Sequence, residues 1–204
     1  VDLRCNPGGY LESAIDVAGV FLGEAPVVLV EEREFVDGYM STRADVFIDG
    51  AMVLLQDEYS ASAAEILAAA LRDNQRALLI GKTTYGKGTV QQIFPLSNGD
   101  KLKLTVARFY SPWGGEINEV GVKPDIEVED ENCLAAVRLI LSSNRGTVHG
   151  KILALELDSF IVAVDAGRLR QAGYWKAWAD IVDGIGDAPV YYGNDSGWNE
   201  LTAE

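Results

Sequence analysis

Histidine, cysteine and positive charge are scarce in this sequence of 204 residues, and each scarcity excludes a class of site. His149 is the only histidine, so a Ser-His-Asp triad would depend entirely on it. It lies in a polar stretch, and we favour a solvated loop residue over a catalytic one. The two cysteines, Cys5 and Cys133, match no zinc-binding spacing. We expect both to be small buried or half-buried residues, and a disulfide between them stays open.

Basic residues and long apolar runs are also lacking. The formal net charge is −14, with 17 Lys and Arg against 31 Asp and Glu. No basic stripe is available to meet a phosphate backbone, which argues against nucleic acid as a partner. No apolar run approaches the roughly 18 residues that a membrane-spanning helix requires. Glu31, Glu32 and Glu34 have no histidine beside them, so we interpret them as a solvated face and predict no metal site.

The sequence does contain a dense set of signals between residues 51 and 91. Its length allows a full core, and its 48% hydrophobic content is ordinary for a globular protein. Apolar runs of strand length, an Ala- and Leu-rich segment and a glycine-rich loop follow one another. They predict a buried strand, a turn with serines, a helix, a second strand and a loop with lysines, at residues 51–56, 57–62, 63–73, 77–80 and 81–88.

Ser62 stands at the first turn of the predicted helix. The free N–H groups and the positive dipole end of a helix lie there, which suits the developing oxyanion of an acyl transfer. Ser62 and Glu65 also match the S-x-x-E capping box, and the local pattern alone favours this structural role. Ser60 competes for the cap, and both serines are kept as cap residues.

A catalytic serine needs a base, and a lysine is the remaining candidate. A lysine acts as a base only when it is neutral, which requires burial or nearby positive charge to lower its pKa. Lys87 fits better than Lys82, because glycines on both sides allow its backbone to approach another element. The structural alternative for Lys87 is an ordinary solvated loop lysine.

The sequence Gly81-Lys82-Thr83 invites a nucleotide-binding interpretation, which we reject. A phosphate-binding P-loop requires G-x-x-x-x-G-K-[ST], and Arg76 occupies the first glycine position. A P-loop also leads into a helix, whereas residues 89–94 have a strand-like pattern.

Four motifs in order resemble the carboxyl-terminal processing, or tail-specific, protease family. The first is Asp2-Leu-Arg-x-Asn-Pro-Gly-Gly9. The second combines Ser60-Ala-Ser-Ala-Ala-Glu65, Asp73-Asn-x-Arg-Ala77, Gly81 and Tyr85-Gly-Lys-Gly-Thr-Val-Gln91. The third and fourth are Leu104-Thr-Val-Ala-Arg-Phe-Tyr110 and Gly121-Val-Lys-Pro-Asp-Ile126. The resemblance covers about residues 1–142.

The resemblance implies a serine endopeptidase with a Ser-Lys dyad. Ser62 becomes the nucleophile, Lys87 the general base, and Gln91 the residue that holds the lysine in place. The backbone N–H of Ala63 and that of Gly8 or Gly9 would form the oxyanion hole. No metal or cofactor is implied.

Two positions depart from the commonest family pattern. Tyr59 stands where many members have Gly, and Ala64 replaces a usual serine. Neither change removes a proposed catalytic group. The ring of Tyr59 would reshape the pocket beside the nucleophile, so we assign it to substrate binding.

The resemblance also implies an α/β fold, with a crotonase- and Clp-protease-like spiral core of mixed sheets and helices at residues 1–142. Composition beyond it predicts a linker at 143–150 and a C-terminal extension of unknown role at 151–204. The N-terminal part of the core and a PDZ domain, usual in the family, are expected to be missing from this chain. Substrates would be proteins or peptides recognised by their C-terminal tails, in the cell envelope at a periplasmic or extracytoplasmic site. A homo-oligomer is compatible with the sequence.

Patterns outside the motifs predict the remaining elements. Helices are expected at 10–22, 132–141 and 167–183, strands at 26–30, 125–128, 152–157 and 160–164, and a hairpin joining 90–96 to 101–110 through Asn98-Gly99. Trp113, Trp175 and Trp178 are expected in the core. Residues 191–204 are polar and contain glycine, which predicts an exposed tail.

Two other classes of function remain as alternatives. One is a catalytically silent module of the same fold that binds peptides or apolar ligands, and the joint presence of Ser62, Lys87 and Gln91 argues against it. The other is a crotonase-type acyl-CoA enzyme. Its chemistry usually requires paired carboxylates, which the sequence lacks near Ser62 and the Asn6–Gly9 turn.

Overall fold

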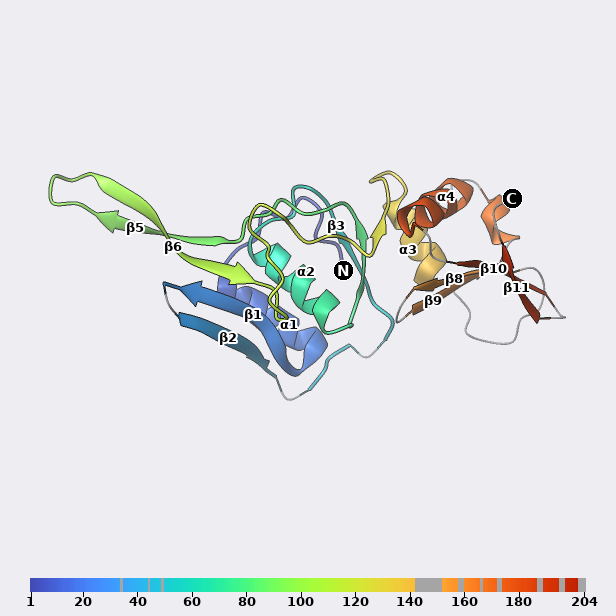
Figure 1. The fold of residues 1–204 in the computed structure, drawn as a ribbon, viewed down its shortest axis with the longest axis horizontal. Coiled ribbons are helices and arrows are strands. Elements are labelled where there is room, and N and C mark those ends of the chain that lie inside the picture. Colours follow the sequence, from blue (N-terminus) through green and yellow to red (C-terminus); the bar gives the residue numbers. More distant parts are fainter. Residues whose placement is uncertain are drawn as a thin grey trace. The chain divides into compact units, whose positions relative to one another are not determined.

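The computed structural model describes residues 1–33, 35–43, 45–48, 50–141, 152–157, 160–165, 167–171, 174–186, 189–194 and 197–201. The chain folds as two compact units, Val1–Leu79 with Thr83–Lys123, and Ile80–Lys82 with Pro124–Glu204. Both contain helices and strands, so the predicted mixed α/β class is confirmed (Figure 1). The predicted linker and His149 lie outside the described residues, and the domain boundary near residue 142 stays a prediction.

The first unit contains an antiparallel sheet of four strands in the order β2-β1-β6-β5. The strands are β1 (Glu24–Glu32), β2 (Phe35–Thr42), β5 (Thr89–Pro95) and β6 (Lys101–Tyr110). Strands β5 and β6 form the predicted hairpin, and Gly99 in its turn has a positive φ of 88°. This hairpin extends away from the rest of the unit (Figure 1).

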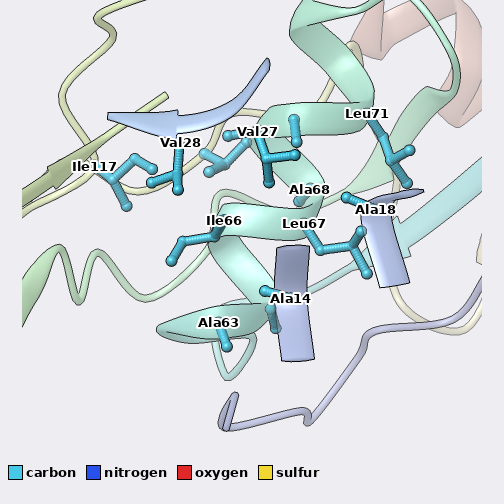
Figure 2. Close-up of a cluster of buried hydrophobic side chains, with 14 of the residues drawn as sticks. Ala14, Ala18, Val27, Val28, Ala63, Ile66, Leu67, Ala68, Leu71 and Ile117 are labelled. Atoms are coloured by element: carbon cyan, nitrogen blue, oxygen red, sulfur yellow. The ribbon is translucent and has the colours of Figure 1, made fainter. Parts of the chain in front are cut away.

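Helix α2 (Ala63–Asp73), predicted with the same bounds, forms the centre of the first unit's core. The side chains of Ala68, Ala69 and Ala70 are fully buried, and such small residues allow neighbouring elements to approach closely. Figure 2 shows this helix packed beside α1 (Leu11–Leu22) and β1. Burial on all sides fixes the N-terminus of α2, where Ser62 lies.

Two buried strands flank α2 in the chain. Strand β3 (Val53–Gln56) precedes it, and β4 (Leu78–Gly81) follows it. All four residues of each are buried, in agreement with the apolar runs. In the first unit the Leu78 N–H donates to the Met52 carbonyl oxygen at 3.0 Å. The serine turn therefore connects a buried strand to a buried helix.

The second unit combines helices with a second antiparallel sheet, ordered β11-β10-β8-β9. Its elements are β7 (Ile126–Glu127), which pairs in parallel with the end of β4, α3 (Cys133–Leu141), β8 (Ile152–Leu157), β9 (Phe160–Asp165), the 3₁₀ helix η1 (Arg168–Arg170), α4 (Tyr174–Gly184), β10 (Val190–Asn194) and β11 (Gly197–Leu201). The helix expected at 167–183 begins seven residues later than predicted, at Tyr174 (174 − 167 = 7). The predicted exposed tail is wrong over the described part of its range, because β10 and β11 pair as a hairpin.

Several predictions of burial are also wrong. Trp113 is 72% exposed, because its indole lies over the end of α2 and donates its N–H to the Asp73 carbonyl oxygen at 2.7 Å. Trp178 is buried in the second unit as expected, but Trp175, in the first turn of the same helix, is exposed. Cys133 is buried and Cys5 is exposed, and the two form no disulfide with each other.

Candidate active site

Ser62 lies on a strained turn between β3 and α2. Its backbone has φ of 57° and ψ of −120°, a conformation that non-glycine residues rarely adopt. Strain of this kind persists only where surrounding contacts hold it, and it is concentrated at functional sites. Nucleophile elbows place a serine on a comparable strand-to-helix turn, which exposes its hydroxyl. The backbone at Ser62 therefore has the form expected for a nucleophile.

Glu65 connects this turn to the lysine loop. Its fully buried carboxylate accepts the N–H of Ser62 and the N–H of Lys87, both on Oε2 and both at 2.8 Å. Oε1 accepts the N–H of Gly86 at 2.7 Å and the hydroxyl of Thr84. The bond to Ser62 is the backward half of the predicted capping box. The bonds to the loop were not predicted, because the S-x-x-E pattern carries no signal about partners 19 to 22 residues away.

The Asn6–Gly9 turn packs directly against the nucleophile turn. The Ala61 N–H donates to the Asn6 carbonyl oxygen at 2.9 Å. A Cβ atom on Gly8 would lie 2.4 Å from the Ala61 carbonyl oxygen and 2.7 Å from the Ala63 nitrogen. Only glycine allows this approach, and Gly8 also has a positive φ of 94°. The structure thus brings Gly8 beside Ser62.

Asp57 links the segment before the Asn6–Gly9 turn to the serine turn by hydrogen bonds. Its carboxylate accepts the backbone N–H groups of Cys5, Tyr59 and Ser60 at 2.9–3.1 Å. Burial by itself raises the pKa of this carboxyl, but the hydrogen bonds from Cys5, Ser60 and Tyr59 outweigh it and hold the pKa below its ordinary value. The buried Ser60 hydroxyl accepts the Asp57 N–H at 3.0 Å and lies 2.8 Å from the Leu3 carbonyl oxygen. Ser60 is therefore a structural residue of this turn.

The lysine loop is placed by close glycine contacts, as the sequence predicted. A Cβ atom on Gly88 would lie 2.4 Å from the backbone nitrogen of Asn118. Gly86 has a positive φ of 88°, and its carbonyl oxygen accepts the Glu119 N–H at 2.8 Å. The segment 117–122 is thus the element that the loop approaches, and it fixes the backbone of Lys87.

A groove of about 490 Å³ brings the candidate residues together. Its lining includes predicted site residues from four segments of the chain: Gly9, Ser62, Ala63, Lys87 and Gln91. The register of β5 against β6 shifts between Val90 and Gln91. Such bulges re-aim side chains and are common beside active sites. Lys87 and Gln91 are both exposed to solvent in the groove.

Other sequence candidates lie elsewhere. Gly8 packs against the Ser62 turn but does not line this groove. Tyr59 does not line it either and is 63% exposed, so its role in substrate binding stays a prediction. Lys82 forms an ion pair with Glu129 at 3.3 Å in the second unit. Strand β5 follows the lysine loop where a P-loop would have a helix. Within the described residues, no three His, Cys, Asp or Glu side chains gather as a metal site requires.

Comparison with known proteins identifies the family. The model of peptidase family S41 matches residues 1–128, which is more than half of the chain. The chain belongs to peptidase family S41. This membership confirms the resemblance to carboxyl-terminal processing proteases that the motifs indicated.

Individual S41 relatives agree in name and fold. The carboxyl-terminal-processing protease of Synechocystis is 41% identical over 129 residues, which cover 63% of this chain and 30% of that protein. The carboxy-terminal processing protease CtpB of Bacillus subtilis is 33% identical over 185 residues, covering 86% of this chain and 37% of that protein. The solved structure of a photosystem II D1 C-terminal processing protease is 34% identical, with a TM-score of 0.62 over 70% of this chain and 38% of that chain. The predicted fold class is confirmed by this likeness.

The S41 chain described here is shorter than its relatives. It spans about a third of the length of these three proteins. None of its described helices is long and apolar enough to cross a membrane.

Proposed function

We propose that this chain carries the catalytic groups of a serine endopeptidase with a Ser-Lys dyad. Ser62 is the nucleophile, Lys87 the general base, and Gln91 the residue that orients the lysine. The observation that carries this proposal is that Ser62, Lys87 and Gln91 line one groove, where Ser62 lies on a strained strand-to-helix turn.

In the first step, the hydroxyl oxygen of Ser62 attacks the carbonyl carbon of a peptide bond. The neutral amine of Lys87 takes the hydroxyl proton as the C–O bond forms. The carbonyl oxygen becomes an oxyanion. When the tetrahedral intermediate collapses, the peptide C–N bond breaks, and Lys87 returns the proton to the departing amine.

The oxyanion requires two backbone donors beside Ser62, and we assign Gly9 and Ala63. The Gly8 N–H already donates to the Asn6 side-chain oxygen at 2.9 Å, so it is occupied. Gly9 lines the groove instead. Ala63 is the first residue of α2, where backbone N–H groups have no partner within the helix. The helix dipole at the same end favours the negative charge.

In the second half of the reaction, water releases the acyl group. Lys87 removes a proton from the water molecule, whose oxygen attacks the ester carbon, and the proton then returns to the Ser62 oxygen as the ester bond breaks. Lys87 is exposed in the groove. We infer that a bound substrate displaces water around its amine as it fills the groove.

The substrates follow from the names of the relatives. Several are called carboxyl-terminal-processing proteases, and we propose that this chain likewise acts on proteins recognised by their C-terminal tails. We place its site of action in the cell envelope, as the family resemblance suggests.

Degradation of unfolded casein by the chain and its variants tests the dyad. We expect Ser62→Ala and Lys87→Ala each to lower the rate at least about 1,000-fold, since removal of a member of such a unit removes most of the catalysis. Lys82→Ala is the matched control and should retain the parent rate, because Lys82 is paired elsewhere.

The outcomes separate the rival functions. Cleavage that survives in Ser62→Ala would overturn the assignment of the nucleophile. A chain that binds casein peptides without cleaving them at any pH would be the silent module. Hydrolysis of an acyl-CoA thioester in place of casein would favour the crotonase-type alternative.

A further inference from the structure

Two side chains of opposite charge line the catalytic groove and have no role in the proposed mechanism. Glu12 comes from the first turn of α1, and Lys103 comes from β6. Both are exposed. Among the described residues, neither forms an ion pair, either with the other or with a third group. Both charges are therefore available to a ligand in the groove.

The strand register explains why Lys103 faces the groove. Lys103 is paired with Ile93, and the next pair along the same face joins Gln91 to Thr105. Gln91 itself lines the groove. Lys101 shares this face but lies two residues nearer the hairpin turn, paired with Pro95, and it does not line the groove. Lys101 is thus a natural control for Lys103.

Glu12 comes from a different segment of the chain than Lys103. It follows Gly9, Tyr10 and Leu11, which also line the groove. Lys103 reaches the groove from the β5–β6 hairpin, together with Gln91. A peptide bound in the groove would therefore meet a carboxylate from α1 and an ammonium group from β6.

We propose that Glu12 and Lys103 determine substrate specificity by charge. The groove selects peptides with an acidic side chain at the position facing Lys103 and a basic side chain at the position facing Glu12. This inference rests on the proposed endopeptidase function. A chain with a net charge of −14 generally repels acidic peptides. A preference for an acidic side chain near Lys103 is opposite in sign, so the two effects can be told apart.

The test compares peptides that differ only at two positions, one on each side of the scissile bond. These positions carry Glu and Lys, Lys and Glu, or Gln and Gln. In further single-charge peptides one position keeps Gln while the other carries Glu or Lys. We expect the parent to cleave one charged order about fivefold faster in kcat/KM than the neutral peptide, the size expected for two exposed ion pairs together. The preference should nearly vanish in about 1 M salt, where charges are screened within about 3 Å.

Charge-reversal variants assign the preference to residues. Lys103→Glu should reverse the preference at the acidic position only, and Glu12→Lys should reverse it at the basic position only. Lys101→Glu makes the same change of net charge outside the groove and should leave the preference of the parent intact. Equal effects of Lys101→Glu and Lys103→Glu would attribute selectivity to net charge and overturn the proposal.

Failure of the specificity and failure of the enzyme are distinguishable. Binding of the same peptides to Ser62→Ala, measured by fluorescence anisotropy, does not depend on cleavage. Charge-dependent binding without any cleavage by the parent would support the specificity and overturn the endopeptidase function. Cleavage of all these peptides at equal rates would support the enzyme and overturn the specificity.

Discussion

Glu65 illustrates how one buried side chain links residues that are distant in the sequence. Its two oxygens accept hydrogen bonds from the Ser62 turn and from the Lys87 loop. The relative position of the two candidate catalytic backbones thus depends on one carboxylate. A buried polar network of this kind stabilises a structure only when every member is satisfied.

The variant Glu65→Gln tests this dependence. Either orientation of the amide places an NH₂ group against at least one backbone N–H that now donates to the carboxylate. We expect the free energy of unfolding of the first unit to fall by about 1–3 kcal/mol, the usual cost of an unsatisfied buried donor. Casein cleavage, compared under conditions where both proteins are folded, should fall further than the unfolded fraction explains.

Glu58→Gln is the matched control for this experiment. Glu58 lies on the same turn but is exposed. Its substitution should change the free energy of unfolding by no more than about 0.5 kcal/mol. Unchanged stability and unchanged cleavage in Glu65→Gln would show that the carboxylate does not position the dyad.

At the scale of elements, the Asn6–Gly9 turn depends on close approach to the nucleophile turn. Gly8→Ala would place a methyl group 2.4 Å from a backbone oxygen at a positive φ. Neither the oxygen nor φ can adjust without moving the turn, so we expect a loss of more than about 1 kcal/mol in the free energy of unfolding. Denaturant unfolding of the first unit measures it. Gly9→Ala, with open space at its Cβ, should change stability by less than about 0.5 kcal/mol, and equal losses in both would contradict this account.

Elements defined by local pattern were predictable from the sequence. Helix α2 and the β5–β6 hairpin have the expected positions, because Ala-Leu content and an Asn-Gly turn act within a few residues. The β10–β11 hairpin was missed, since its strands contain polar residues and glycines, and their pairing depends on a neighbouring strand, β8. Val190, Tyr191 and Tyr192 do have high β propensity, but propensity does not indicate which strands pair.

The candidate site was predictable to a similar extent. The motifs identified Ser62, Lys87 and Gln91, and the structure brings them to one groove. The residues that hold them could not be found, because the roles of Asp57 and Glu65 arise from tertiary hydrogen bonds. Lys103 was missed for another reason: its position in the groove follows from the register of β6 against β5.

For the whole molecule, the excess of Asp and Glu over Lys and Arg makes the dependence of stability on pH a useful test of carboxylate roles. Asp57 is buried, with a pKa held below its ordinary value of 3.8 by hydrogen bonds from the Asn6–Gly9 side and the serine turn. A carboxyl with a lowered folded-state pKa stabilises the fold above its ordinary pKa. This stabilisation is lost as the pH falls through the lower folded-state value. Asp57 therefore couples acid stability to the geometry of the candidate oxyanion hole.

We accordingly expect Asp57→Asn to lower the free energy of unfolding of the first unit by about 1–3 kcal/mol at pH 6, because an amide cannot accept all of these hydrogen bonds. The difference from the parent should shrink below about pH 3.8, where the parent carboxyl begins to lose its advantage. Hydrogen exchange of peptides from residues 51–73 measures it in the relevant unit. Asp16→Asn, on the exposed side of α1, should change stability by less than about 0.5 kcal/mol at either pH. A difference between Asp57→Asn and the parent that grows towards low pH would reverse the sign and refute the role assigned to this carboxylate.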